Sequence, residues 1–228
     1  MTKNFIQLDE AKWPKTKGRR IDGFRFYEID GKNYPSITTV LGAQQKPGLI
    51  KWRQSVGEDA AKWEMARAAR RGKATHDLVE QYLKGDTPSI RDVLPLGLFR
   101  LLKPYLESID NIHAIEQIMY SHKYTIAGQV DCIAEYNGKL SVIDFKTANK
   151  ERNDSWNENY YIQCSAYAEM YEELFGTRID QIVILMASED GAVRAFVKDK
   201  KDYLVALKEN IAYFYKYYEE KTKDKIKS

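Results

Sequence analysis

The chain is poor in the residues that stabilise small proteins through disulfides or zinc. Its 228 residues include only two cysteines and three histidines. Cys132 and Cys164 stand far apart, each among apolar neighbours, which indicates buried free thiols in a reducing compartment and no disulfide framework. Two cysteines and three histidines also provide no spacing typical of a structural zinc site.

Long apolar runs and a strong excess of one charge are missing as well. No segment approaches the length of a membrane span, and the N-terminal MTKNFIQLDE has no hydrophobic signal core, so we expect a cytoplasmic protein without membrane contacts. No glycine-rich phosphate loop of the Walker type is present, so we expect no ATP cofactor. The formal net charge is only +3. Nucleic-acid binding must therefore be judged from how the charges are distributed.

The remaining composition is that of an ordinary folded domain, with 43% apolar and 30% charged residues. Its length is sufficient to bury one core. Residues 47–85 predict helices that are interrupted at Gly57 and Gly72. The segment SWNE at 155–158 matches a capping box and predicts the start of a helix that ends near Gly176.

The most informative stretch runs from residue 128 to residue 149 and predicts a β-hairpin. Two strands flank an Asn137-Gly138 turn of the type that requires positive φ at both residues. Asp131 lies in the first strand among apolar residues. Asp144 and Lys146 lie in the second strand and share one face, because side chains alternate along a strand. A charge so close to a core is costly unless it is paired or bound to a metal.

Two interpretations of these charges are open. In the first, Asp144 and Lys146 form an ion pair at a sheet edge, and Asp131 is a solvated residue near the turn. In the second, Asp131 and Asp144 are hard oxygen ligands for Mg²⁺ or Mn²⁺, with the backbone carbonyl of Phe145 as a third. Lys146 would then hold an attacking water or stabilise the charge that develops on a phosphate.

Three motifs, taken in order, resemble the RecB-like branch of the PD-(D/E)xK nuclease superfamily. Asp131, followed by DFK at 144–146, is similar to its catalytic core, with aspartate where many members carry glutamate. RGKATH at 71–76 resembles the upstream histidine motif, and QCSAY at 163–167 resembles the downstream Gln-x-x-x-Tyr motif. The stretches 128–147 and 34–41 (YPSITTVL) are similar to the mitochondrial genome maintenance exonuclease group and its phage relatives. The resemblance covers roughly residues 34–170.

This resemblance implies an α/β (α+β) fold of the restriction-endonuclease type, with a mixed central sheet flanked by helices and an N-terminal helical region. We expect a single nuclease domain over 1–228. Its parts are a flexible basic arm (1–20), a helical region with the histidine motif (36–110), a catalytic sheet core (111–200), and a C-terminal helix with a basic tail (201–228). Some RecB-like relatives hold an iron–sulfur cluster in cysteine clusters, which two distant cysteines do not provide.

The resemblance also implies a set of metal ligands. His76 reaches the metal together with Asp131 and Asp144. Glu80 lies one helical turn after His76 and is a candidate for fixing the imidazole tautomer. Glu116, near the start of an expected strand at 115–124, fits loosely as a further ligand, and a surface glutamate is the alternative.

On the downstream helix, Gln163 and Tyr167 share one face. One interpretation is that they are an amide and a phenol with a structural role at the interface between helix and sheet. The resemblance instead implies that they face the active site, with Gln163 near the catalytic amine or water and Tyr167 near a substrate phosphate. The expected catalytic residues are therefore Asp131, Asp144, Lys146, Gln163 and Tyr167.

Cations and tryptophans gather just before His76. From Lys46 to Lys73 there are eight basic residues against three acidic ones, a larger local surplus than the +3 of the whole chain. Such a stretch is usually a solvated helix face with its tryptophans in the core, but cations with interleaved aromatics are also what a single nucleic-acid strand requires. Beside the nuclease motifs we favour DNA binding, through Lys51, Trp52, Arg53, Arg67, Arg70, Arg71, Lys73 and Thr147.

Together these features predict a Mg²⁺- or Mn²⁺-dependent deoxyribonuclease. We expect an exonuclease that acts on single-stranded DNA or DNA ends in replication, recombination or DNA degradation, alongside proteins of those pathways. If the chain is phage-encoded, its compartment is the host cytoplasm. A structure-specific endonuclease of the same fold and a non-catalytic nucleic-acid-binding module are the alternatives.

Overall fold

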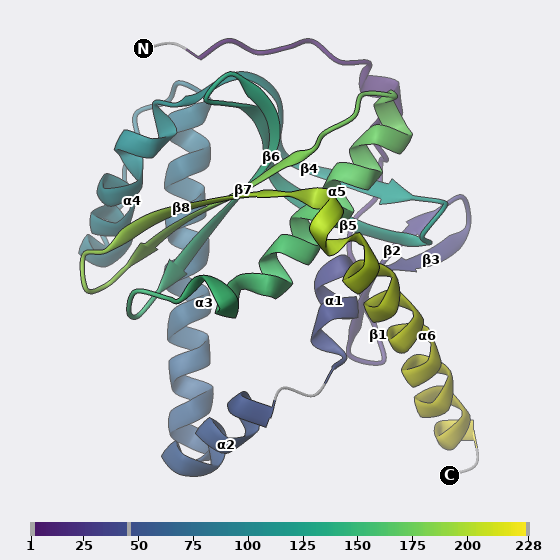
Figure 1. The fold of residues 1–228 in the computed structure, drawn as a ribbon. Helices are drawn as coiled ribbons and strands as arrows, with labels where there is room; N and C mark the ends of the chain where they lie inside the picture. Colours follow the sequence, from purple (N-terminus) through teal and green to yellow (C-terminus); the bar gives the residue numbers. More distant parts are fainter. Residues whose placement is uncertain (1–2, 45–46, 227–228) are drawn as a thin grey trace.

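A five-stranded sheet in the order β4-β5-β6-β7-β8 organises the chain, which a computed structural model describes over residues 3–44 and 47–226 (Figure 1). Its strands are β4 (Ile109–Ser121), β5 (Ile126–Tyr136), β6 (Lys139–Ala148), β7 (Gln181–Ser188) and β8 (Val193–Asp199). The β6–β7 pair is parallel and the other neighbouring pairs are antiparallel. Helix α5 (Glu158–Phe175) makes the crossover that a parallel pair requires. The mixed sheet with flanking helices confirms the expected fold class.

The hairpin between β5 and β6 forms as the sequence predicts. Asn137 has φ 53° and Gly138 has φ 74°, which is the pair of positive values that a two-residue turn of this kind needs. The resulting register sets Cys132 opposite Ile143 and Tyr136 opposite Lys139. Because β6 lies in the middle of the sheet, its charged residues are not at a sheet edge.

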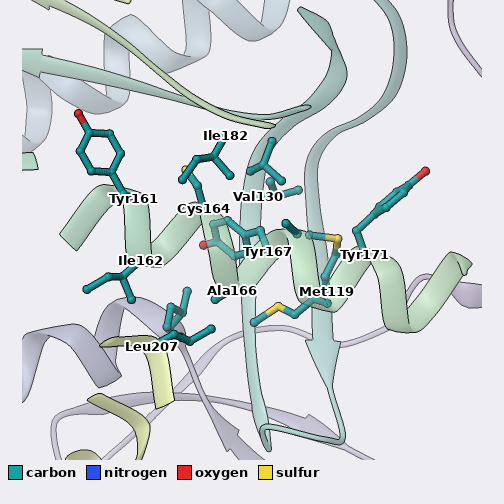
Figure 2. Packing of buried hydrophobic residues seen from close by; sticks show 14 of the residues in the cluster. Met119, Val130, Tyr161, Ile162, Cys164, Ala166, Tyr167, Tyr171, Ile182 and Leu207 are labelled. Carbon is teal, nitrogen blue, oxygen red and sulfur yellow. The ribbon is translucent and has the colours of Figure 1, made fainter. Parts of the chain in front are cut away.

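Buried apolar residues form one cluster on each face of this sheet. On one face, α5 packs against side chains such as Val130 and Ile182, and Figure 2 shows Tyr167 and Cys164 of α5 directed into this layer. On the other face, Leu78 and other side chains of α3 (Glu58–Leu83) and α4 (Val93–Leu106) pack against alternate residues of the same strands. The sheet centre is thus covered on both sides. None of the helices among the described residues is long and apolar enough to cross a bilayer.

A second, three-stranded sheet precedes this core. It consists of β1 (Arg19–Ile21), β2 (Phe24–Ile29) and β3 (Lys32–Pro35), all antiparallel. The short helix α1 (Ile37–Gly42) follows directly, with Ser36 as its N-cap: the Thr39 amide donates to the Ser36 Oγ at 3.1 Å. A bridge between Ser36 and Ala127 places the start of α1 beside β5.

The first residues differ from the flexible arm that the sequence predicts for 1–20. The Ile6 amide donates to the Ile112 carbonyl at 2.8 Å, and the Ile112 amide donates to the Asn4 carbonyl at 2.8 Å. The 3₁₀ turn η1 (Glu10–Lys12) then brings the Trp13 ring to 4.6 Å from the Phe175 ring. Residues 3–13 are therefore docked on the main sheet and on α5, an arrangement that no local pattern indicates.

The helical region also departs in one respect from the prediction. Gly57, with φ 87°, separates α2 (Pro47–Val56) from α3 as expected. Gly72 does not interrupt the helix, because α3 continues through it for 26 residues. A glycine costs a helix only about 1 kcal/mol, and the buried contacts of Leu78, Val79 and Leu83 oppose that cost.

The segment at 155–158 is not the predicted capping box. Asn153 caps the 3₁₀ turn η2 (Asp154–Asn157), accepting a hydrogen bond from the Ser155 amide at 3.1 Å, and α5 begins only at Glu158. The predicted end of α5 is confirmed, since Gly176 adopts the left-handed conformation with φ 72°. The turn η3 (Lys200–Tyr203) leads into the last helix, α6 (Leu204–Ile226). Lys46 of the basic segment and residues 1–2 and 227–228 of the two expected basic ends lie outside the described residues.

Candidate functional site

Three carboxylates lie in one row across three adjacent strands. The pairs Ile115–Cys132 and Gln117–Val130 set Glu116 of β4 opposite Asp131 of β5. The last β5–β6 pair, Cys132–Ile143, sets Asp131 next to Asp144 of β6. The β5–β6 register thus sets the two predicted aspartates side by side. The β4–β5 register adds Glu116, which the sequence placed only loosely.

His76 approaches this row from α3. Its Nε2 lies 2.5 Å from the Phe145 carbonyl oxygen, which accepts its hydrogen, and its Nδ1 lies 3.5 Å from the Asp131 Oδ2. In the neutral imidazole this leaves Nδ1 as the nitrogen with a free lone pair. His76, Glu116 and Asp131 each offer one ligand atom, and these atoms lie within 4.8 Å of one another. One imidazole with two carboxylates fits a divalent cation such as Mn²⁺ or Mg²⁺.

Two of the predicted metal contacts are engaged differently. The Phe145 carbonyl oxygen, expected as a ligand, is occupied by His76. Glu80, expected to fix the imidazole tautomer, instead accepts a hydrogen bond from Lys84 at 2.6 Å. The orientation of the His76 ring is therefore set by the sheet and not by a neighbour on its own helix.

Glu116 is held where its negative charge is unfavourable. Its pKa is raised to about 8, first by burial and then by the nearby Asp131, Glu80 and Asp77 carboxylates. Its backbone has φ 53°, a conformation that non-glycine residues rarely adopt. The Gln129 side-chain amide donates to Glu116 Oε2 at 2.9 Å. A cation at this point would offset the repulsion among the carboxylates.

Asp144 and Lys146 form the ion pair that one sequence interpretation proposes, but at the buried centre of the sheet. The Asp144 side chain is 1% exposed and contacts the Lys146 amine. Burial raises the pKa of Asp144 to about 6, while Lys146 opposes that rise. Burial works against the charged Lys146 amine, but the Asp144 and Asp131 carboxylates outweigh it and raise the pKa of that amine. The lysine is thus kept positively charged.

Asp144 and Asp131 differ in how far their acceptor oxygens are used within the protein. Although Asp144 Oδ2 touches the Lys146 amine, it accepts no well-aligned hydrogen bond from the described residues. Asp131 is not the solvated residue of the ion-pair interpretation: its side chain is 12% exposed, and its Oδ2 accepts from the Phe145 amide at 3.0 Å. Buried carboxylates with free acceptor capacity favour a bound cation or a donor from a substrate.

Gln163 and Tyr167 of α5 lie beside this pair, as the resemblance implies. The Gln163 side-chain nitrogen is 3.4 Å from Asp144 Oδ1 and 3.4 Å from the Tyr167 hydroxyl. The Lys146 amine also lies 5.0 Å from the centre of the Tyr160 ring, a contact that sequence reasoning missed. Tyr160 lies one helical turn before Gln163, on the face that carries the recognised motif but outside the motif itself.

Gly128 is a second residue that sequence reasoning missed. A Cβ atom there would lie 2.8 Å from the Tyr167 ring and 3.2 Å from Ile37. The absent side chain therefore makes room for the Tyr167 ring beside β5. The available signal was a glycine inside an otherwise apolar strand, which often marks a close approach.

Two cavities meet at His76, Glu116 and Gln129. The larger has a volume of about 690 Å³ and extends along α3, past Lys73, Asp77 and Glu80. The smaller has a volume of about 200 Å³ and reaches the N-terminal sheet and α1. The side chains that line the smaller cavity beyond this shared edge include Arg25, Tyr27, Ser36, Thr38, Asp131, Gln163 and Tyr167.

Two of the predicted DNA-binding residues are tied to each other inside the protein. Arg71 is 5% exposed, donates to Thr147 Oγ1 at 3.2 Å and to Asn149 Oδ1 at 2.5 Å, and pairs with Glu189. Arg67 pairs with the same carboxylate at 2.6 Å. The buried Arg71 therefore joins α3 to the end of the sheet and does not face DNA as predicted. Thr147 is half-buried, and its contact with DNA stays a prediction.

The other predicted DNA contacts lie at the surface. Arg53 pairs with Glu58 at 2.7 Å, and Lys73 lies 3.4 Å from Asp77. Trp63 is 58% exposed, so it is not a core residue. Lys51 and Arg70 are exposed, Trp52 is half-buried, and neither of the two cations has a carboxylate partner in the described part of the chain.

Known proteins with exonuclease names are similar to parts of this chain. The mitochondrial genome maintenance exonuclease 1 of Homo sapiens is 33% identical over 129 residues, which are 52% of this chain and 38% of that protein. The Mus musculus protein of the same name is 23% identical over 177 residues, which are 72% of this chain and 52% of that protein. The chain thus spans about half the length of these relatives or less. The solved structure of a putative exonuclease from Eubacterium rectale matches over 64% of this chain and 67% of its own chain, with 10% sequence identity and a TM-score of 0.46.

The family model gives the widest match. The description "PD-(D/E)XK nuclease superfamily" fits residues 51–227, a range that includes α3, the whole main sheet and α5. A segment of an ATP-dependent helicase/nuclease from Clostridium kluyveri is 30% identical over 86 residues, 37% of this chain and 7% of that protein. The matched range contains every residue of the carboxylate row and both flanking motifs, and the chain belongs to the PD-(D/E)XK nuclease superfamily.

Proposed function

We propose that this chain is a Mg²⁺- or Mn²⁺-dependent DNA exonuclease that hydrolyses phosphodiester bonds. The observation that carries the proposal is the convergence of Glu116, Asp131 and Asp144 from three strands, with His76 above them and Lys146 paired beside them. A protein that only binds nucleic acid has no need for buried carboxylates with unfilled acceptor capacity.

His76, Glu116 and Asp131 would hold the metal. When bound, a divalent cation lowers the pKa of a water and neutralises charge on a phosphoryl group. The Phe145 carbonyl oxygen is engaged by His76, and Asp144, which the sequence also suggests as a ligand, is paired with Lys146. We therefore assign the ligands to the three side chains and give Asp144 the role of holding the lysine. The Phe145 carbonyl instead fixes the imidazole tautomer, so that the other ring nitrogen faces the carboxylates.

Lys146 would provide a fixed positive charge at the reacting phosphate. Asp144 keeps the amine protonated and in place, and the Tyr160 ring lies on its other side. Gln163 holds Asp144 through its side-chain nitrogen at 3.4 Å. A charge that is positioned in advance stabilises the transition state without reorganisation during the reaction. The Tyr167 hydroxyl, on the wall of the smaller cavity, would donate to a phosphate oxygen.

The preference for single strands or ends rests on the helices in front of the site. The larger cavity leads from His76 along α3. Beyond it, α2 and the first half of α3 extend away from the sheet (Figure 1) and carry exposed Lys51, Trp63 and Arg70. Cations for phosphates and a ring for base stacking are what a single strand needs. We place this activity in replication, recombination or DNA degradation.

The test compares DNA with and without ends. Linear single-stranded DNA labelled at either end and covalently closed circular single-stranded DNA are incubated with Mg²⁺, with Mn²⁺, and with a chelator. We expect degradation of the linear substrate in either metal, none in the chelator, and an intact circle. Cleavage of the circle would favour a structure-specific endonuclease, and tight binding without cleavage in any metal would favour a non-catalytic module.

A further inference from the structure

The smaller cavity contains an arginine that has no counterpart in the recognised motifs. Arg25 comes from β2, and the cavity joins it to Asp131, His76 and Tyr167. The Arg25 guanidinium lies against the Tyr27 side chain, whereas those of Arg19, Arg53, Arg67 and Arg71 pair with carboxylates. A guanidinium that lines the same cavity as the carboxylate row is in place to bind an anion between itself and a metal.

The Arg25 side chain is held in position before any ligand arrives. Its guanidinium carbon lies 5.1 Å from the centre of the Tyr27 ring. On the other side it lies against Gly18, where a Cβ atom would come within 2.4 Å of the Arg25 Nε. A glycine at position 18 is therefore required for this placement of the guanidinium.

Hydroxyl groups from the start of α1 face the same cavity. The Arg25 amide donates to Thr39 Oγ1 at 3.1 Å, and the Ser36 amide donates to the Arg25 carbonyl at 2.9 Å. These two bonds fix β2 against α1, so that Arg25 and Thr38 line one cavity together. The Ser36 hydroxyl is engaged as the helix cap and donates to Thr39 Oγ1. The Thr38 side chain is exposed, and its hydroxyl lies 3.0 Å from the Ser36 hydroxyl, from which it would turn to donate to a ligand.

The size of the cavity limits what it can hold. Its volume of about 200 Å³ is below the roughly 300–1,000 Å³ of sites that enclose whole small molecules. Its inner wall is tightly packed, since even one carbon added at Gly128 would collide with Tyr167 and Ile37. A phosphoryl group fits this space.

We propose that this cavity binds the terminal phosphate of the DNA substrate, with Arg25 and Thr38 as its principal contacts. The assignment rests on the proposed nuclease function and adds to it the recognition of a phosphorylated end. A guanidinium with a fork of donors suits a terminal phosphate better than a lysine would. The site also explains why an exonuclease would carry an arginine in the same cavity as its metal ligands.

The experiment measures binding, so that it does not depend on hydrolysis. Fluorescence anisotropy is measured in Ca²⁺, with cleavage checked to be absent. It compares four versions of one single-stranded oligonucleotide, which carry a phosphate or a hydroxyl at the 5′ end and a phosphate or a hydroxyl at the 3′ end. We expect one phosphorylated end to bind about tenfold more tightly than its hydroxyl twin. Arg25→Ala and Arg25→Lys should remove that difference, and Thr38→Val should reduce it. The matched control is Arg20→Ala, a charge removal in β1 outside the cavity, which should preserve the difference.

Two results would overturn this site. Equal binding of all four oligonucleotides by the unaltered protein would exclude recognition of a terminal phosphate. A uniform loss of affinity for all four in Arg25→Ala would make Arg25 a contact for an internal phosphate. A preference for one phosphorylated end in a protein that never cleaves would retain the phosphate site while refuting the nuclease proposal, so the two failures are distinguishable.

Discussion

Helix α3 has two halves that carry similar charges in different surroundings. The first half, with α2, extends away from the sheet, and Ala61 is its one buried residue before Arg71 (Figure 1). The second half, from Arg71 onward, packs on the sheet and delivers His76 to the carboxylate row. Neighbouring arginines illustrate the difference, because Arg70 is exposed and Arg71 is buried against Glu189.

The comparison shows that buried charged residues indicate function more strongly than exposed ones. A charged residue at the surface costs little, so the cations of the first half are consistent with DNA binding or with mere solvation. A buried charge costs several kcal/mol unless it is compensated. Asp131, Asp144 and Lys146 therefore require a reason that surface charges do not. We expect substitutions in the buried region to change the chemistry and substitutions in the exposed half of α3 to change affinity.

The largest effect is expected for Asp131→Asn. The amide preserves the shape and an acceptor for the Phe145 amide but weakens the metal site, so cleavage of linear DNA should fall by about 10³-fold or more. Rates are measured with end-labelled DNA, and thermal melting checks that the variant folds. Near-normal cleavage by the folded variant would contradict the metal assignment.

Next in size is the effect of Lys146→Ala. Removal of a positioned charge at the reacting phosphate should lower the rate by about 10²–10³-fold, while DNA affinity in Ca²⁺ stays within about twofold of the original. Single-turnover cleavage and anisotropy separate the two quantities. If affinity falls in step with rate, Lys146 is a binding residue and not part of the chemistry.

The neighbouring arginines give a matched pair with a smaller effect. Arg71→Ala should lower the free energy of unfolding by about 1.5–3 kcal/mol, because it removes hydrogen bonds between charged and polar groups that tie α3 to the sheet. Arg70→Ala should leave stability unchanged and reduce the slope of log affinity against log salt by about 0.7 for single-stranded DNA. Denaturant unfolding and salt titrations test both. Equal stability losses in the two variants would remove the proposed difference between the halves of α3.

The smallest effect is expected at Trp63. Because its ring is 58% exposed, Trp63→Ala should change stability by no more than about 0.5 kcal/mol. If a base stacks on the ring, the same change should weaken single-strand binding by about 1–3 kcal/mol, and Trp63→Phe should retain most of the affinity. Unchanged binding in a folded Trp63→Ala would leave this part of α3 as a solvated surface.

Local patterns account for the parts of the site that the sequence predicts. The Asn137-Gly138 turn fixes the register of β5 against β6, and this register can be derived from the sequence. The register in turn sets Asp131 beside Asp144. The motif spacing likewise places Gln163 and Tyr167 on one face of α5. These features depend on residues close together in the chain or on a recognised family pattern.

Features that depend on long-range packing were not predictable in the same way. The role of Arg71 depends on Glu189, 118 residues later, in a turn that has no motif. Arg25 enters the site because the N-terminal sheet docks beside β5 through Ser36 and Ala127. The position of Glu116 depends on a β4–β5 register that includes an irregularity between Asp110 and Ala114. Such placements follow from tertiary contacts that periodicity and turn chemistry do not encode.

The central claim is that His76, Glu116 and Asp131 together bind a divalent cation, and a calorimetric titration with Mn²⁺ tests it most directly. The account predicts that the unaltered protein binds Mn²⁺ and that Glu116→Gln and Asp131→Asn each weaken this binding by at least about tenfold. Asp59→Asn, a change to an exposed carboxylate in the first half of α3, should leave the titration unchanged. Titrations of Glu116→Gln and Asp131→Asn that match the unaltered protein would contradict the account.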